Sequence, residues 1–238
     1  MDNKIKLGIM QPYFFPYIGY FQLMNAVDTY VVYDDVNFIK GGWINRNNIL
    51  IGNKPQRINL ILSDASPNKL INEIEIKHDL NIYRDKLLKT IQMNYSKAPF
   101  FDKFFPVLQR IFLYDEFNLS LFLYNSFVEL NKYMDIKTHL VLSSGLSKDN
   151  ALRGEDKVLD ICRALNAGEY YNAIGGSELY SKERFAQNNV DLYFLKTDDD
   201  LEYSQFKGEF VPNLSIIDVL MFNSVEQVHK LLGKYTLI

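Results

Sequence analysis

Residues 5–33 read IKLGIMQPYFFPYIGYFQLMNAVDTYVVY and indicate the class of fold. The first six are mostly apolar and are followed by Gln-Pro, which is typical of a buried strand that ends in a turn. Residues 17–26 carry apolar side chains at helical spacing, and Pro16 suits the first position of a helix. Residues 29–33 are β-branched or aromatic and predict a second strand. A strand, a helix and a strand this close together form a βαβ unit, which implies a parallel sheet.

The rest of the chain departs from this pattern and then returns to it. Apolar runs on either side of Gly52 and Pro55 predict a hairpin over residues 48–62, and residues 71–76 alternate like a short strand. Ser215 and Asp218 fit an N-terminal helix cap and its reciprocal acid. Helices are expected at 83–95, 101–112, 119–133, 156–165, 181–187, 215–222 and 224–232, and further strands at 139–142, 170–172 and 191–195.

These elements predict an α/β fold with a doubly wound, mostly parallel, Rossmann-like sheet that is interrupted by a hairpin and a helical insertion. A chain of 238 residues has the size of one large domain. We expect residues 1–238 to form a single α/β domain in which residues 48–135 are the insertion. Ligands of such folds bind at the carboxyl ends of the strands, where the strand order reverses.

Composition excludes several classes of protein. The only cysteine, Cys162, leaves no partner for an intrachain disulfide or a multi-cysteine metal site. The net charge of -3 argues against a nucleic-acid-binding protein. We find neither a secretory signal nor an apolar stretch long enough for a membrane span, so we expect a cytoplasmic protein. His78, His139 and His229 are far apart, and we interpret them as non-catalytic.

Clusters of polar and aromatic residues follow four of the predicted strands. In a parallel sheet these clusters meet at one edge, and such convergence favours a binding site. We interpret Asp34, Asp35 and Ser144 as candidate catalytic residues, and we assign no metal ligand. Each cluster also has a structural alternative, namely a turn, a helix cap, a solvated loop or a surface charge. The candidate substrate-binding residues are Gln11, Tyr13, Tyr17, Gly19, Tyr20, Lys40, Trp43, Asn45, Arg46, Asn47, Ser143, Gly175 and Gly176.

The motif Tyr17-Ile-Gly-Tyr20 stands at the predicted start of the first helix. Nucleotidylyltransferases and related adenylate-forming enzymes carry H-x-G-H in this context and bind nucleotide phosphates at the helix N-terminus. Tyrosine replaces both histidines here, so only the backbone part of that function is retained as a hypothesis. The chain contains no G-x-S-x-G, P-loop or G-x-G-x-x-G motif.

The chain resembles the WbqC-like family over nearly its whole length. The matching stretches are 11–21 (QPYFFPYIGYF), 34–40 (DDVNFIK), 43–47 (WINRN), 94–99, 143–144, 175–180, 210–218 (FVPNLSIID) and 222–223. The resemblance implies a role in the synthesis of O-antigen and other surface polysaccharides, in which an amino acid such as glycine, or another acyl group, is added to a sugar. It carries no established catalytic residue over to this chain.

Our first hypothesis is therefore a transferase that N-acylates or aminoacylates a nucleotide-linked amino sugar. Asp34 or Asp35 would accept the amine proton or bind magnesium, Ser144 would position the acyl group, and Arg46 or Lys40 would bind phosphate. The donor is either an acid activated by ATP with magnesium or an acyl thioester, for example on an acyl carrier. Two alternatives stay open: a nucleotidyl- or glycosyl-transfer step on the same pathway, and a non-catalytic sugar-nucleotide-binding protein.

Overall fold

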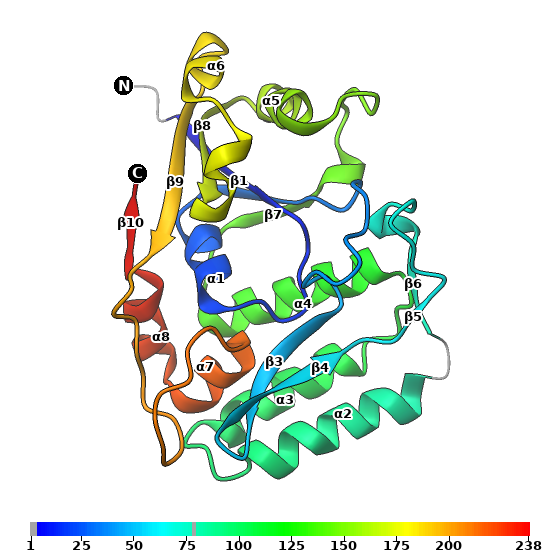
Figure 1. Cartoon of the computed structure of the whole chain (residues 1–238), viewed down its shortest axis with the longest axis vertical. Helices are drawn as coiled ribbons and strands as arrows, with labels where there is room; N and C mark the ends of the chain where they lie inside the picture. The colour runs from blue at the N-terminus through cyan, green and yellow to red at the C-terminus, as the bar shows by residue number, and fades with distance from the viewer. Residues whose placement is uncertain (1–3, 78–79) are drawn as a thin grey trace.

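A six-stranded sheet forms the centre of the molecule, and the computed structural model describes residues 4–77 and 80–238 (Figure 1). The strand order is β10-β9-β8-β1-β2-β7. β10 runs antiparallel to β9, whereas the other neighbouring strands run parallel. Numbered along the chain within this sheet, the order is the 3-2-1-4-5-6 order of a Rossmann fold, and it reverses between β1 and β8. The strands are β1 (Ile5–Met10), β2 (Thr29–Val32), β7 (His139–Leu142), β8 (Ala167–Ala173), β9 (Asp191–Thr197) and β10 (Tyr235–Leu237).

Helices cover both faces of this sheet (Figure 1). Alternate strand residues point to opposite sides, so that Leu7, Ile9 and Val31 pack in one core while Tyr30 and Val32 pack in the other. The expected α/β fold with a doubly wound, mostly parallel sheet is confirmed. The first core is closed by α5 (Gly154–Ala164) and α6 (Lys182–Gln187), and the second by α1 (Ile18–Asn25), α7 (Ile216–Phe222) and α8 (Val225–Leu232).

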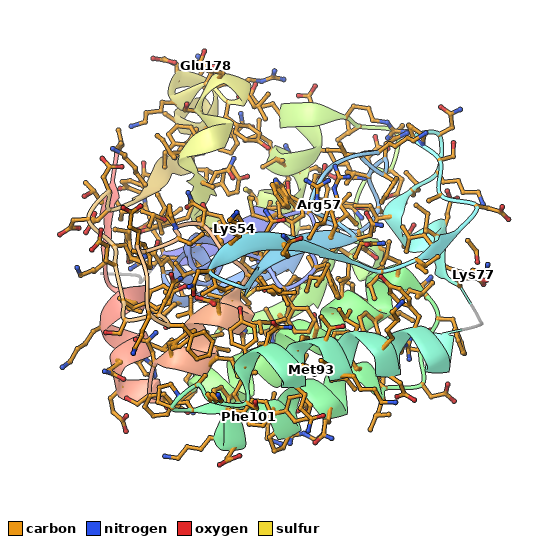
Figure 2. The ribbon with its side chains drawn as sticks, turned by 60° about the horizontal axis from the view of Figure 1, so that its bottom comes forward. Lys54, Arg57, Lys77, Met93, Phe101 and Glu178 are labelled. Atoms are coloured by element: carbon orange, nitrogen blue, oxygen red, sulfur yellow. The ribbon has the colours of Figure 1, made fainter. Side chains whose placement is uncertain are left out.

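Between β2 and β7 the described residues form two small sheets and three α-helices that extend the second core. In Figure 2 the β3–β4 hairpin crosses the molecule, with Lys54 and Arg57 at the surface and α2 with Met93 below it. That the chain is one domain with residues 48–135 as an insertion stays a prediction. The elements of this segment are β3 (Arg46–Ile51), β4 (Lys54–Asn59), β5 (Leu62–Ser63), β6 (Glu75–Ile76), α2 (Leu80–Tyr95), α3 (Phe101–Phe112) and α4 (Leu119–Met134).

The strand expected over residues 71–76 is wrong for its first half. Ile71–Glu73 form a 3-10 turn, and only the two residues of β6 are extended. The Glu73 carboxylate accepts a hydrogen bond of 2.8 Å from the backbone N–H of Leu70, and this local contact closes the turn.

The reciprocal cap expected at the start of α7 is also incomplete. Ser215 caps the helix, since its hydroxyl accepts from the backbone N–H of Ile217 at 3.2 Å. The carboxylate of Asp218 is buried and accepts hydrogen bonds of 2.7 Å from the hydroxyls of Tyr95 and Tyr203 instead. A long-range network has therefore taken the place of the local contact.

Two further facts concern the described helices and the residues that are not described. Every described helix is too short or too polar to traverse a lipid bilayer. His78 and residues 1–3, on which the expectations for the histidines and the N-terminus partly rest, lie outside the described residues.

Candidate functional site

The carboxyl ends of β2 and β7 bring Asp34 and Ser144 into contact. Asp34 is 1% exposed. Its carboxylate accepts hydrogen bonds from the backbone N–H of Ser144 at 2.9 Å, from the Ser144 hydroxyl at 2.7 Å and from the hydroxyl of Ser120 on α4 at 3.0 Å. Ser144 itself is exposed, so its hydroxyl links a buried carboxylate to the molecular surface.

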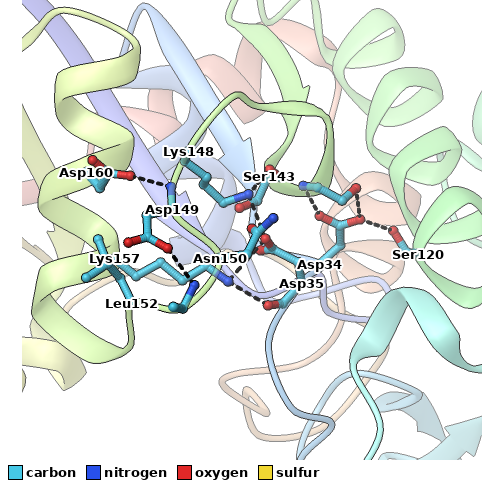
Figure 3. Close-up of polar contacts among 12 residues, drawn as sticks. Asp34, Asp35, Ser120, Ser143, Lys148, Asp149, Asn150, Leu152, Lys157 and Asp160 are labelled. Atoms are coloured by element: carbon cyan, nitrogen blue, oxygen red, sulfur yellow. Dashed lines mark hydrogen bonds and ion pairs between the residues drawn. The ribbon is translucent and has the colours of Figure 1, made fainter.

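Asp35 is held by two buried lysines (Figure 3). Its Oδ2 lies 2.7 Å from Nζ of Lys148 and 3.1 Å from Nζ of Lys157. Lys157 also donates to the backbone carbonyl of Asp35 at 2.7 Å, and its ammonium lies 5.3 Å from the centre of the Tyr33 ring. Burial alone would raise the pKa of Asp35, but the hydrogen bonds from Lys148, Ser143 and Lys157 outweigh it and lower that pKa. Asp35 is therefore a counter-ion that stays charged at neutral pH.

These groups surround a pocket of about 300 Å³, which we call the carboxylate–lysine pocket. Asp34 and Lys148 lie directly behind its wall, in contact with Ser144 and Asp35. Its described lining contains two cations, Arg153 and Lys157, and one carboxylate, Asp35, so the lining carries one positive charge in excess. Such a pocket attracts an anionic group, for example a phosphate. Its lining residues are Asp35, Leu70, Asn72, Ser144, Asn150, Arg153 and Lys157.

A second concave region lies beside the loop that follows β1. It consists of two pockets of about 190 and 280 Å³ that share Tyr17 and Asn213, and we call it the Tyr17 groove. Tyr17 and Trp43 are 37% and 44% exposed there, which is unusual for large aromatic side chains. Its other lining residues are Tyr13, Pro16, Ile18, Asn47, Thr197, Asp198, Asp199, Leu201, Tyr203, Phe210, Pro212, Leu214 and Val219.

Asn47 lines this groove, but its amide is engaged by the chain itself. Its Nδ2 donates to the carbonyls of Phe14 at 3.1 Å and Phe15 at 2.7 Å, and its Oδ1 accepts from the backbone N–H of Asn48 at 2.8 Å. Phe15 has a φ of 43°, which is strained for a bulky residue. Asn47 thus holds a strained loop in place.

The other polar residues predicted beside Trp43 have similar internal partners. Asn45 donates to the carbonyl of Leu60 at 2.9 Å, and Nε of Arg46 donates to the carbonyl of Gly42 at 2.9 Å. Lys40 is exposed. None of these three residues lines the pockets described above.

The Tyr17-Ile-Gly-Tyr20 motif positions the aromatic rings of its two tyrosines. Tyr20 is buried, and its hydroxyl donates to the backbone carbonyl of Gln11, whose own side chain is half-buried. A Cβ at Gly19 would lie 2.5 Å from the Tyr17 ring and 2.6 Å from the Thr197 hydroxyl. Glycine is required there because the Tyr17 ring occupies that space.

Gly175 and Gly176 line neither region. They belong to a 3-10 helix over Ile174–Leu179 that follows β8, and a Cβ on Gly176 would meet the side-chain amide of Asn172 at 2.4 Å. Ser143 is fully buried, and it does not line the pocket, although its hydroxyl forms a hydrogen bond with Asp35. Three of the four predicted clusters thus line a pocket, and they divide between two pockets.

Sequence reasoning missed Lys148, Lys157, Arg153 and Ser120. Lys157 gave one usable signal, since it stands four residues before Ile161 on the buried face of α5, where a lysine requires a partner. Lys148 lies in a polar loop and gave none.

Comparisons with known proteins agree with the motifs in this chain. An uncharacterized protein of Mycobacterium tuberculosis, Rv1507c, is 27% identical over 220 residues, which cover 92% of this chain and 93% of the relative. No solved structure matches the chain. The family model described as "WbqC-like protein family" matches residues 11–230. Because that match includes most of the sequence, the chain belongs to the WbqC-like protein family.

Proposed function

We propose that this protein is a transferase that adds an acyl or aminoacyl group, such as glycyl, to the amine of a nucleotide-linked amino sugar in surface-polysaccharide synthesis. Membership of the WbqC-like family supports the pathway. The observation that carries the proposal is the Ser144 hydroxyl, which is exposed at the carboxylate–lysine pocket and bonded at 2.7 Å to the buried carboxylate of Asp34.

Amide formation needs a proton acceptor beside a site for an anionic leaving group. The sugar amine attacks the acyl carbon, and either the phosphate of an acyl adenylate or the thiolate of an acyl thioester leaves. The Ser144 hydroxyl takes the amine proton as it passes its own to Asp34. Lys157 and Arg153 bind the phosphates, and Asp35 keeps the two lysines in position.

Asp34 and Asp35 already have partners within the protein, and this favours acyl transfer over nucleotidyl or glycosyl transfer. Those reactions would use Asp34 and Asp35 as magnesium ligands. Asp34 already accepts three hydrogen bonds, and one oxygen of Asp35 faces two lysines. A protein that binds the sugar nucleotide without turnover is the second candidate, because Lys157 and Arg153 in the pocket lining would bind phosphates whether or not Asp34 accepts a proton.

The test is incubation of the purified protein with nucleotide-linked amino sugars and two donor systems: amino acids with ATP and magnesium, and acyl thioesters. Mass spectrometry should detect the mass gain of an amide. Ser144→Ala and Asp34→Asn should abolish that gain, whereas Lys54→Ala, on the exposed face of the hairpin, should not change it. Sugar-nucleotide binding with no mass gain from any donor would favour the binding-only role.

A further inference from the structure

We infer that the Tyr17 groove binds a saccharide ring that is either uncharged or carries an amine, and that the phosphates of the substrate lie outside it. The inference deepens the proposed function and rests on it for the idea that the substrate is a sugar. It assigns the Tyr17 groove to the sugar ring and the carboxylate–lysine pocket to the phosphates of a nucleotide-linked sugar.

Charge separates the two regions. None of the described residues that line the Tyr17 groove is Lys, Arg or His. Two of them, Asp198 and Asp199, carry carboxylates, and Asp199 is ion-paired with Lys196 at 2.9 Å. A phosphate would be repelled there, whereas sugar hydroxyls would find acceptors. The carboxylate–lysine pocket has the opposite balance, with Lys157 and Arg153 in its lining.

The exposed rings suit the apolar face of a sugar. Trp43 and Tyr17 are exposed rings in the lining of the groove, and Tyr13 and Pro16 add further apolar lining. A pyranose has one face of C–H groups that packs on an aromatic ring and an edge of hydroxyls that needs polar neighbours. Asn213 is a polar neighbour that lines both halves of the groove.

The wall of the groove next to Trp43 is rigid and strained. Phe15 adopts its positive φ because its carbonyl accepts hydrogen bonds from Asn47 at 2.7 Å and from the Ser215 hydroxyl at 2.8 Å. The backbone N–H of Phe14 donates to the carbonyl of Trp43 at 3.0 Å. Strain of this kind persists only where surrounding contacts over-determine it, and it is concentrated at ligand sites.

A second set of contacts, separate from those beside Trp43, holds the side chain of Tyr17 in place. Gly19 leaves room for its ring, and Thr197 forms a hydrogen bond with its hydroxyl. The Thr197 hydroxyl donates to Gln22 at 2.7 Å, and Gln22 donates to the carbonyls of Leu231 and Lys234 at 2.8 Å each. A ring held by such a chain of buried contacts is pre-organised, which lowers the entropy cost of stacking a ligand on it.

Trp43 provides the measurement, because it is the only tryptophan of the chain and its fluorescence reports on the groove alone. The intact protein is titrated with the methyl glycosides of glucosamine and N-acetylglucosamine, with uridine and with inorganic phosphate. We expect a saturable change with a glycoside that salt does not weaken, and none with uridine or phosphate. A change with uridine or phosphate alone, or no change with any glycoside up to millimolar concentrations, overturns the inference.

Variants of Tyr17 test the stacking. Tyr17→Ala should weaken glycoside binding by about tenfold, and Tyr17→Phe should retain most of it because the ring remains. Tyr114→Ala is the matched control, since Tyr114 is 41% exposed and lines neither half of the groove. Equal affinities for all three variants would refute stacking on Tyr17, and urea unfolding checks that each variant is folded.

The two proposals fail in different ways. Glycoside binding without an amide product leaves the groove assignment intact and refutes acyl transfer. Amide formation on a sugar that gives no response at Trp43 refutes the groove assignment and leaves acyl transfer intact.

Discussion

Nζ of Lys148 lies 2.7 Å from Oδ2 of Asp35, and the two side chains are only 1% and 9% exposed. Lys157 approaches the same oxygen to 3.1 Å. A single carboxylate thus neutralises part of the charge of two buried lysines, and the remainder makes the adjoining pocket cationic. The pair of aspartates is divided between two tasks, since Asp34 is bonded to hydroxyls and Asp35 to ammonium groups.

Replacement of Asp35 by asparagine should destabilise the protein strongly. Both lysines would lose their counter-ion in a site with little water, and removal of one partner from a buried ion pair costs about 3–5 kcal/mol. Urea unfolding of Asp35→Asn measures the loss. The control is Asp199→Asn, which removes an exposed partner of Lys196 and should leave the unfolding midpoint nearly unchanged. Wild-type stability of Asp35→Asn would contradict the counter-ion role.

Because of the same ion pairs, the free energy of unfolding should decrease at acid pH. The pKa of Asp35 is lower in the folded protein than in the unfolded chain, where an aspartate titrates at about 3.9. The stability that Asp35 contributes is therefore complete above that value and is lost as the pH falls through the folded pKa. Unfolding curves of wild type and Asp35→Asn should converge as the pH is lowered below about 4. A difference that stays constant through this range would exclude the linkage.

Gly19→Ala should displace Tyr17. The new Cβ would lie 2.5 Å from the ring and 2.6 Å from the Thr197 hydroxyl, closer than van der Waals contact permits. We expect a loss of about 1–3 kcal/mol in the free energy of unfolding, as for other overpacked sites, together with a shift in the emission of Trp43. Gly145→Ala serves as the control because a Cβ there meets nothing within 4 Å. If Gly19→Ala matched that control, the glycine would have no packing role.

Asn47→Ala should release the strained loop. The carbonyls of Phe14 and Phe15 would lose buried hydrogen bonds, at a cost of about 1–3 kcal/mol. Unfolding in urea gives the stability, and increased exposure of Trp43 to a soluble quencher reports on the loop. Asn48→Ala, one residue along the same strand, provides the comparison and should have a smaller effect. An unchanged Trp43 accessibility in Asn47→Ala would show that other contacts suffice to hold the loop.

Arg153→Gln should weaken the binding of phosphate-bearing substrates. Arg153 lines the carboxylate–lysine pocket, and a hydrogen bond to a charged group contributes about 1.5–3 kcal/mol, so KM should rise by about tenfold or more. Its kcat should change less, and the dependence of KM on salt should diminish. Arg163→Gln removes an exposed arginine from α5, the helix that Arg153 precedes, and should have no such effect. A fall in kcat with KM unchanged would place Arg153 outside the phosphate site.

Most elements were predictable because their signals are local. The apolar runs of β1 and β2, the helical spacing after Pro16 and the return of alternation after residue 139 each lie within a few residues of sequence. The exceptions show where this reasoning fails. The carboxylate of Asp218 serves Tyr95, 123 residues away, and no local pattern announces that contact. β10 was not predicted because a strand of three residues at the edge of the sheet is too short to show an alternating pattern.

The candidate site was predictable only as a set of loops. The parallel sheet implied that residues after β1, β2, β7 and β8 would meet at one edge, yet Gly175 and Gly176 after β8 line neither pocket. The sequence could not divide them into a cationic pocket and an aromatic groove. That division depends on side-chain directions, which follow from packing.

The periodicity of the chain therefore determined the kind of sheet, the edge at which we expect ligands and the residue types that follow the strands, since each follows from backbone geometry over short distances. The role of each residue depended on partners that the sequence separates widely. Ser144 reaches Asp34 across 110 residues, and Lys157 reaches Asp35 across 122. Only folding brings such charges together out of water, and their removal from water determines which carboxylate is a counter-ion and which one is linked to the surface.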